Sequence, residues 1–123
     1  MENVKTYLVR HEKYGDGNLP NAFDDVILYS GEDKKSQVRS MLSKIKSKGV
    51  NSLLIEGGPA TVSTFIEAEA IDVLQLHHTP LVLGSGKNML DLPTIKTISE
   101  GKFLKHSFYT QMGNAFMSTG SLC

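Results

Sequence analysis

The 123-residue chain lacks the features that mark secreted, membrane-spanning or nucleic-acid-binding proteins. It has no tryptophan, and its one cysteine, Cys123, is the last residue, which excludes an internal disulfide and favours a reducing compartment. Thirteen basic residues balance thirteen acidic ones, so charge gives no reason to expect nucleic acid or an anionic membrane as a partner. No apolar run is long enough to span a bilayer. We therefore expect a cytoplasmic protein forming one domain over residues 1–123.

What the first half does contain is an alternation of strand-like and helix-like segments. Strands are expected over residues 4–11 and 25–30, which are rich in β-branched and aromatic side chains. A helix is expected over residues 34–48, where apolar residues recur every three or four positions and Gly49 follows as a cap. The apolar run 52–55 then predicts a buried strand. Short links between strand, helix and strand predict a parallel, right-handed crossover.

The second half begins with a helix expected over residues 60–70 and an extended segment over residues 72–83. Pro80 should mark a bulge or a sheet edge in that segment, since it cannot donate a backbone hydrogen bond. Three short β-like runs follow, over residues 94–99, 103–111 and 115–122. Turn residues around Gly113 join the last two runs, which predicts a closing antiparallel hairpin.

The rest of the chain is organised around the stretch Ser52–Thr61, in which the apolar run ends at Glu56 and turns through Gly57, Gly58 and Pro59. Glycine lets backbone N–H groups approach a ligand, and the start of a helix favours anions such as phosphate. Proline suits the first helical position because its missing N–H would have no partner there. The alternatives are a tight connection without a ligand, and a Glu56 carboxylate that only accepts backbone N–H bonds.

Hydroxyl groups follow this turn at Thr61, Ser63 and Thr64. They either donate to a bound phosphate or satisfy the N–H groups at the start of the helix, and the sequence leaves both open.

Two other patterns are weaker indications of a functional site. His77 and His78 are neighbours on a strand, so they point to opposite faces, and we expect no metal site. Residues 84–87 contain two glycines and a lysine but lack the spacing of a phosphate loop. We expect a solvated turn there, the alternative being that Lys87 meets a substrate phosphate.

Three motifs in order carry a family resemblance: Glu-Gly-Gly at residues 56–58, Ile-Asp-Val-Leu at 71–74, and Pro-Leu-Val-Leu-Gly-Ser-Gly at 80–86. From about Asp25 onward the chain resembles the C-terminal reductase domain of the bifunctional riboflavin-biosynthesis deaminase–reductase. That resemblance implies the dihydrofolate-reductase-like α/β fold, a mostly parallel mixed sheet with an antiparallel C-terminal hairpin and helices on both faces. The family's opening motifs are not recognisable before Asp25, which implies an N-terminally truncated domain.

The resemblance also implies an activity, the reduction by NADPH of a small substrate, a ribosylamino-pyrimidine phosphate. Glu56 matches the carboxylate at the substrate, and Ser30 matches a hydroxyl near the cofactor. The cofactor phosphates are held by the turn and the first helical turn, which comprise Gly57, Gly58, Pro59, Ala60, Thr61, Val62, Ser63 and Thr64. The paired glycines match those of dihydrofolate reductases, which allows a cis peptide bond between them.

A truncated sheet also suggests an alternative role, that of a non-catalytic remnant acting as a binding or assembly module. In either case the loss of opening strands leaves sheet edges unpaired, and unpaired edges associate unless they are covered. We therefore expect a homo-oligomer, in the simplest form a homodimer.

Overall fold

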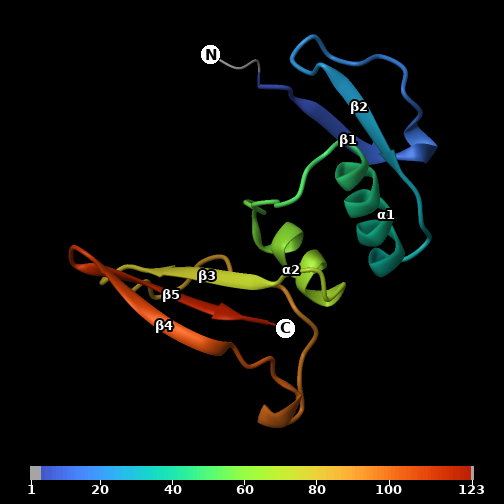
Figure 1. The fold of residues 1–123 in the computed structure, drawn as a ribbon. Helices are drawn as coiled ribbons and strands as arrows, with labels where there is room; N and C mark the ends of the chain where they lie inside the picture. The colour runs from blue at the N-terminus through green and yellow to red at the C-terminus, as the bar shows by residue number, and fades with distance from the viewer. Residues whose placement is uncertain (1–3, 123) are drawn as a thin grey trace. The chain divides into compact units, whose positions relative to one another are not determined.

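The computed structural model describes residues 4–122, which form an α/β fold divided into two compact units (Figure 1). Unit 1 comprises residues 4–57 and 64–70, and unit 2 comprises residues 58–63 and 71–122. The α/β class expected from the sequence is confirmed.

Unit 1 is built on two parallel strands, β1 (Tyr7–His11) and β2 (Asp25–Tyr29), which pair residue for residue from Tyr7 with Asp25 to His11 with Tyr29. The connection between them contains one 3-10 turn, η1 (Glu12–Tyr14). Two paired parallel strands need a connection of about a dozen residues between them. Residues 12–24 provide this connection without an α-helix. Both expected strands are confirmed.

Helix α1 (Lys34–Ser47) follows β2 and begins in a reciprocal cap. The Asp33 carboxylate accepts from the Ser36 backbone N–H at 2.9 Å, and the Asp33 N–H donates to the Ser36 hydroxyl at 3.2 Å. Each bond satisfies a backbone donor that the helix itself leaves unpaired, which fixes where the helix begins. Gly49, with a φ of 88°, follows its end, so the expected helix and its glycine stop are confirmed.

Helix α2 (Pro59–Glu67) has proline at its first position, as expected. Its end is closed by two backbone bonds, from the Ala70 N–H to the Phe65 carbonyl and from the Glu69 N–H to the Ile66 carbonyl, both 3.0 Å. Glu69 has a φ of 55°, the left-handed conformation that this helix-ending pattern requires. The helix therefore stops at the end of its apolar stripe.

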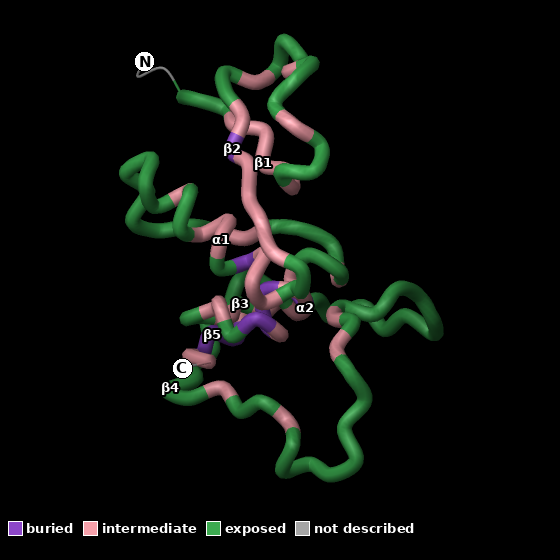
Figure 2. The backbone as a smooth tube through the Cα atoms, turned by 90° about the vertical axis from the view of Figure 1, so that its right-hand side faces the viewer, coloured by how far each residue is buried: buried purple, intermediate pink, exposed green. Residues whose placement is uncertain are grey.

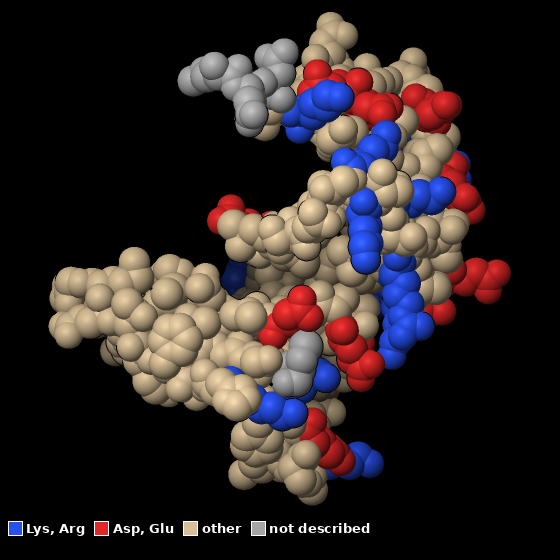
Figure 3. All heavy atoms as spheres, viewed as in Figure 1, with Lys and Arg blue, Asp and Glu red and all other residues tan. Residues whose placement is uncertain are grey.

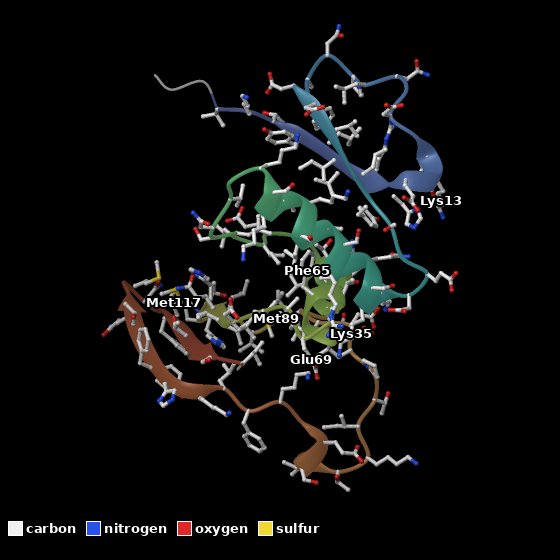
Figure 4. The ribbon with its side chains drawn as sticks, turned by 45° about the vertical axis from the view of Figure 1, so that its right-hand side comes forward. Lys13, Lys35, Phe65, Glu69, Met89 and Met117 are labelled. Atoms are coloured by element: carbon white, nitrogen blue, oxygen red, sulfur yellow. The ribbon has the colours of Figure 1, made fainter. Side chains whose placement is uncertain are left out.

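The core of unit 1 joins β2, α1 and the second half of α2, and Figure 2 shows its buried positions in purple. Its buried apolar side chains are Ile27, Val38, Phe65, Ile66 and Ala68. At the rim an ion pair between Lys35 and Glu69, 2.9 Å apart, links α1 to the end of α2 (Figure 4). Such an exposed pair contributes about 0–1 kcal/mol, so the apolar contacts carry most of the stabilisation.

Unit 2 contains an antiparallel sheet of three strands in the order β3-β5-β4. The strands are β3 (Val73–His78), β4 (Lys105–Met112) and β5 (Ala115–Ser121). A two-residue turn joins β4 to β5, and Gly113 has the positive φ, 65°, that hairpin turns of this length favour at their first position. The predicted closing hairpin is confirmed.

Three expected strand segments differ in the structure. Residues 52–55 form no strand and pair with no strand described, and Leu54 is 76% exposed, so neither the buried strand nor the crossover is formed. An apolar run becomes a buried strand only where neighbours supply both hydrogen bonds and cover. β3 ends at His78, before Pro80, and residues 94–99 form no strand but lead into the 3-10 turn η2 (Ile98–Glu100).

Candidate functional site

The end of β2 is fixed tightly to α1, and Ser30 takes part in this. The Ser30 N–H donates to the Ser40 hydroxyl at 3.0 Å, and the two hydroxyl oxygens lie 3.3 Å apart. The side chain that the family resemblance assigns to the cofactor therefore contacts α1. A ligand at Ser30 would have to share a hydroxyl that already has a partner.

Gly31 closes the same strand end. Its φ is 128°, and a Cβ there would lie 2.7 Å from the Gln37 backbone nitrogen, so only glycine fits without displacement. The Gly31 carbonyl lies 3.0 Å from His11 Nε2 and accepts from the Gln37 amide at 3.2 Å. His11 Nδ1 accepts from the Lys13 N–H at 3.2 Å, which leaves the proton on Nε2 to bond Gly31. This tight packing could only be found with coordinates.

Glu56 is exposed and makes no hydrogen bond or ion pair with any of residues 4–122. The alternative in which its carboxylate accepts backbone N–H bonds at the turn is therefore not observed. Gly57 beside it is also exposed, and the peptide bond between Gly57 and Gly58 is trans. The carboxylate at this point of the chain is thus available to a ligand.

The start of α2 has free space around Gly58, the residue before the helix. A Cβ on Gly58 would meet nothing within 4 Å, and the Gly58 carbonyl accepts the Val62 N–H at 3.3 Å as the first bond of the helix. Ala60 and Thr61 are exposed on this turn. A small anion can therefore approach the start of the helix, where the helix dipole is positive.

Ser63 has a different role from the one considered for it. The residue is 2% exposed, and its hydroxyl accepts the Asp91 backbone N–H at 2.7 Å. The hydroxyl thus holds the long segment after β3 against α2, in unit 2, rather than facing a phosphate. Val62 and Thr64 are half-buried, which leaves Thr61 as the exposed hydroxyl of the three that the sequence marks.

Histidines in unit 2 behave as the strand pattern predicts. His77 is exposed, whereas His78 is half-buried, stacks on Phe116 with ring centroids 4.5 Å apart, and lies 3.1 Å from the Ser118 hydroxyl. Within residues 4–122 no group of three metal-ligating side chains could hold an ion. Lys87 is exposed in a segment without helix or strand.

The carboxyl groups of Asp25 and Asp33 have lowered pKa values, and both belong to the scaffold of unit 1. The Ser36 backbone N–H is the main cause of the lowered pKa of Asp33. The Val26 backbone N–H, and then Lys48 at 3.1 Å, lower the pKa of Asp25. Hydrogen bonds to the ionised form account for both shifts.

Comparison with known proteins identifies the family of the chain. Residues 2–114 match the family described as the RibD C-terminal domain, including residues 2–24, where the family's sequence motifs are not recognisable. Two curated relatives are each named riboflavin biosynthesis protein RibD. The one from Corynebacterium ammoniagenes is 29% identical over 68 residues, 55% of this chain and 20% of its own length. The one from Buchnera aphidicola subsp. Baizongia pistaciae is 25% identical over 101 residues, 81% of this chain and 27% of its own length.

A solved structure agrees in fold. The structure titled Acinetobacter baumannii RibD, form 2, superposes with a TM-score of 0.66 at 14% identity, covering 95% of this chain and 37% of that one. The chain thus spans about a quarter of the length of its curated relatives. No helix within residues 4–122 has the length and apolar character needed to cross a bilayer. With its motifs, its fold and the match over residues 2–114 in agreement, the chain belongs to the RibD C-terminal domain family.

Proposed function

We propose that this chain is an NADPH-dependent reductase domain acting on a phosphorylated aminopyrimidine in riboflavin biosynthesis. One observation supports the proposal most. Glu56 is exposed, has no partner in the described chain, and directly precedes the open glycine turn at the start of α2. When bound, NADPH supplies the hydride, so the protein needs to contribute binding, orientation and electrostatics rather than a nucleophile.

The residues of the turn take different parts in this proposal. The backbone of residues 57–61 holds the cofactor phosphates, because Gly58 leaves room for close approach and the Thr61 hydroxyl is exposed. Glu56 orients the sugar of the substrate or polarises the group being reduced. Ser63 acts by stabilising α2, as the bond from the Asp91 N–H to the Ser63 hydroxyl indicates.

Ser30 is the weakest member of the proposed cofactor site, since its hydroxyl faces Ser40. We propose that it acts on the cofactor only through the position of the β2 end. The proposal also places the protein in the cytoplasm, as one reductase-like domain that works as a homo-oligomer.

NADPH binding to the whole chain tests the cofactor site. We expect calorimetry to give a dissociation constant well below 1 mM, and Gly58→Ala to weaken binding at least tenfold because a methyl group would block phosphate approach. The fold should be unchanged, since that methyl group meets no protein atom within 4 Å. Millimolar or weaker binding by the unsubstituted chain would oppose the proposal.

Turnover of the aminopyrimidine substrate tests Glu56. We expect Glu56→Gln to retain NADPH binding and to lose most of the reductase activity, whereas Glu12→Gln, an exposed carboxylate on η1, should leave both unchanged. A chain that binds NADPH but shows no turnover would identify it as a non-catalytic binding module.

A further inference from the structure

His11, the last residue of β1, uses both nitrogens of its ring. Nε2 lies 3.0 Å from the Gly31 carbonyl oxygen, and Nδ1 accepts the Lys13 backbone N–H at 3.2 Å. A carbonyl oxygen only accepts hydrogen bonds and a backbone N–H only donates them, so the two bonds together require a neutral ring with its proton on Nε2. The fold therefore selects one of the three protonation states that imidazole can adopt.

The two bonds connect different parts of unit 1 through one ring. The bond to Gly31 joins β1 to the link between β2 and α1, where the same carbonyl also accepts from the Gln37 amide at 3.2 Å. The bond from Lys13 caps η1, the turn with which the β1–β2 connection begins (Figure 4). On the side of β2 the His11 ring packs edge to face against Tyr29, with ring centroids 5.4 Å apart. We call the ring and its bonds to Gly31 and Lys13 the His11 clasp.

Acid has a specific effect on this clasp. Imidazole is the side chain that gains a proton between about pH 8 and 5, and in His11 the added proton goes to Nδ1. Nδ1 is then a donor that faces the Lys13 N–H, which is also a donor, so the bond between them is lost. Nε2 remains a donor, and its bond to Gly31 becomes charge-assisted. Acid thus breaks one of the two bonds and keeps the other.

The surroundings of the clasp do not compensate for an added charge. Among residues 4–122 no carboxylate forms an ion pair with His11. The titratable group against the ring from β2 is Tyr29, and α1 contributes the neutral Gln37 amide through Gly31. The charged residues of η1 and of the link before α1 are exposed, namely Glu12, Lys13, Glu32 and Asp33. Figure 3 shows acidic and basic side chains intermingled on the surface of unit 1.

We propose that His11 is a pH-sensitive clasp, which holds the start of the β1–β2 connection near neutral pH and releases it in mild acid. The closed clasp excludes the proton that the open one accepts, so closure is favoured at higher pH and lost as pH falls. The same connection has a second attachment, from the Arg10 guanidinium to the Gly17 carbonyl at 2.7 Å, and a guanidinium does not titrate in this range. The released part is therefore η1. The inference is independent of the proposed function.

Amide hydrogen exchange followed by NMR tests the clasp in the whole chain. The protection factor of the Lys13 N–H, which removes the intrinsic effect of pH, should fall about fivefold from pH 8 to pH 5, the usual effect of losing a cap bond. The Gly15 N–H, which donates to the Glu12 carbonyl at 2.8 Å in η1, should lose protection with it. At the higher pH the imidazole nitrogen shifts should place the proton on Nε2. Equal protection of Lys13 at both pH values, or a proton on Nδ1 at the higher one, would overturn the proposal.

Two substitutions of His11 separate its two bonds. His11→Asn puts a side-chain oxygen two residues before the Lys13 N–H, the spacing of an Asx turn, so Lys13 should stay protected at both pH values. His11→Gln can still donate to the Gly31 carbonyl, but it should leave Lys13 unprotected at both. His77→Gln, at an exposed histidine of unit 2, is the matched control and should keep the full pH response. A response that persists in His11→Asn would assign it to another group and refute the clasp.

Discussion

The two units of the chain are stabilised in different ways. Unit 1 buries five apolar side chains on β2, α1 and α2, among them Val38 at 1% exposure. In unit 2 the buried side chains are Ser63, Ser118 and Thr119, while large apolar residues such as Val82 stay exposed. The same sequence thus builds one unit around an apolar core and the other around backbone pairing and hydroxyl contacts.

The difference shows how much a sheet can depend on its surroundings. Of the buried hydroxyl groups in unit 2, those of Ser63 and Ser118 have partners, whereas the Thr119 hydroxyl has none within the described chain. A buried polar atom without a partner costs about 1–3 kcal/mol. Unit 1 also has one, Arg10 Nε, so the two units differ through the buried apolar side chains, which belong to unit 1. Substitutions of equal size should therefore have unequal effects in the two units.

The largest expected effect is that of Ile66→Ala. Ile66 is 3% exposed in the core of unit 1, and truncating such a side chain costs about 2–5 kcal/mol of unfolding free energy through lost burial and an internal cavity. Val82→Ala in unit 2 should change it by less than about 0.5 kcal/mol, because Val82 is 92% exposed. Urea unfolding followed by circular dichroism measures both. Equal losses would show that the contrast between the units is wrong.

Glycine substitutions give the next largest effect. Gly31→Ala should cost about 2–4 kcal/mol, since the added methyl group meets the Gln37 backbone in a conformation unfavourable to alanine. Gly120→Ala in unit 2 should cost about 1–2 kcal/mol, because its methyl group meets the Leu104 side chain at 2.6 Å. Thermal unfolding of the two variants compares them, and a larger loss for Gly120→Ala would reverse the comparison.

The smallest expected effect concerns acid. The pKa of Asp33 is lowered in the folded state, so its cap stabilises the fold above the ordinary carboxyl pKa of 3.8, and this contribution is lost as pH falls through the lower folded value. Asp33→Asn should remove that part of the pH dependence between about pH 5 and 2. Ser36→Ala is the control, because it keeps the backbone N–H that mainly causes the shift. Identical urea midpoints at every pH in Asp33→Asn and the unsubstituted chain would contradict this.

Much of the fold followed from local patterns. The helix at residues 34–48, the proline start of α2 and the hairpin turn at Gly113 depend on neighbours in sequence, and each is confirmed. Residues 52–55 have the composition of a buried strand, but pairing depends on partners elsewhere, and composition says nothing about whether they are in place. In β3 a local rule decides instead. The strand ends at His78, before Pro80, although apolar residues continue to residue 83, because proline cannot donate a backbone hydrogen bond to a neighbouring strand.

The candidate site was predictable to a smaller extent. The glycine turn and the exposed carboxylate of Glu56 follow from residue type and order, which is why the motif marks them. The inward-facing Ser63 hydroxyl does not, because its partner, the Asp91 N–H, lies 28 residues further along the chain. The requirement for glycine at residue 31 was not predictable either, since it arises from the close approach of the Gln37 backbone in α1.

The hydroxyl-lined interior of unit 2 has a consequence for how the protein responds to temperature. The heat capacity of unfolding rises with exposed apolar surface and falls with exposed polar surface, so a sheet that buries serine and threonine contributes little to it. The curvature of the stability profile, and with it any loss of structure near freezing, therefore originates mainly in the unit that contains Val38 and Ile66.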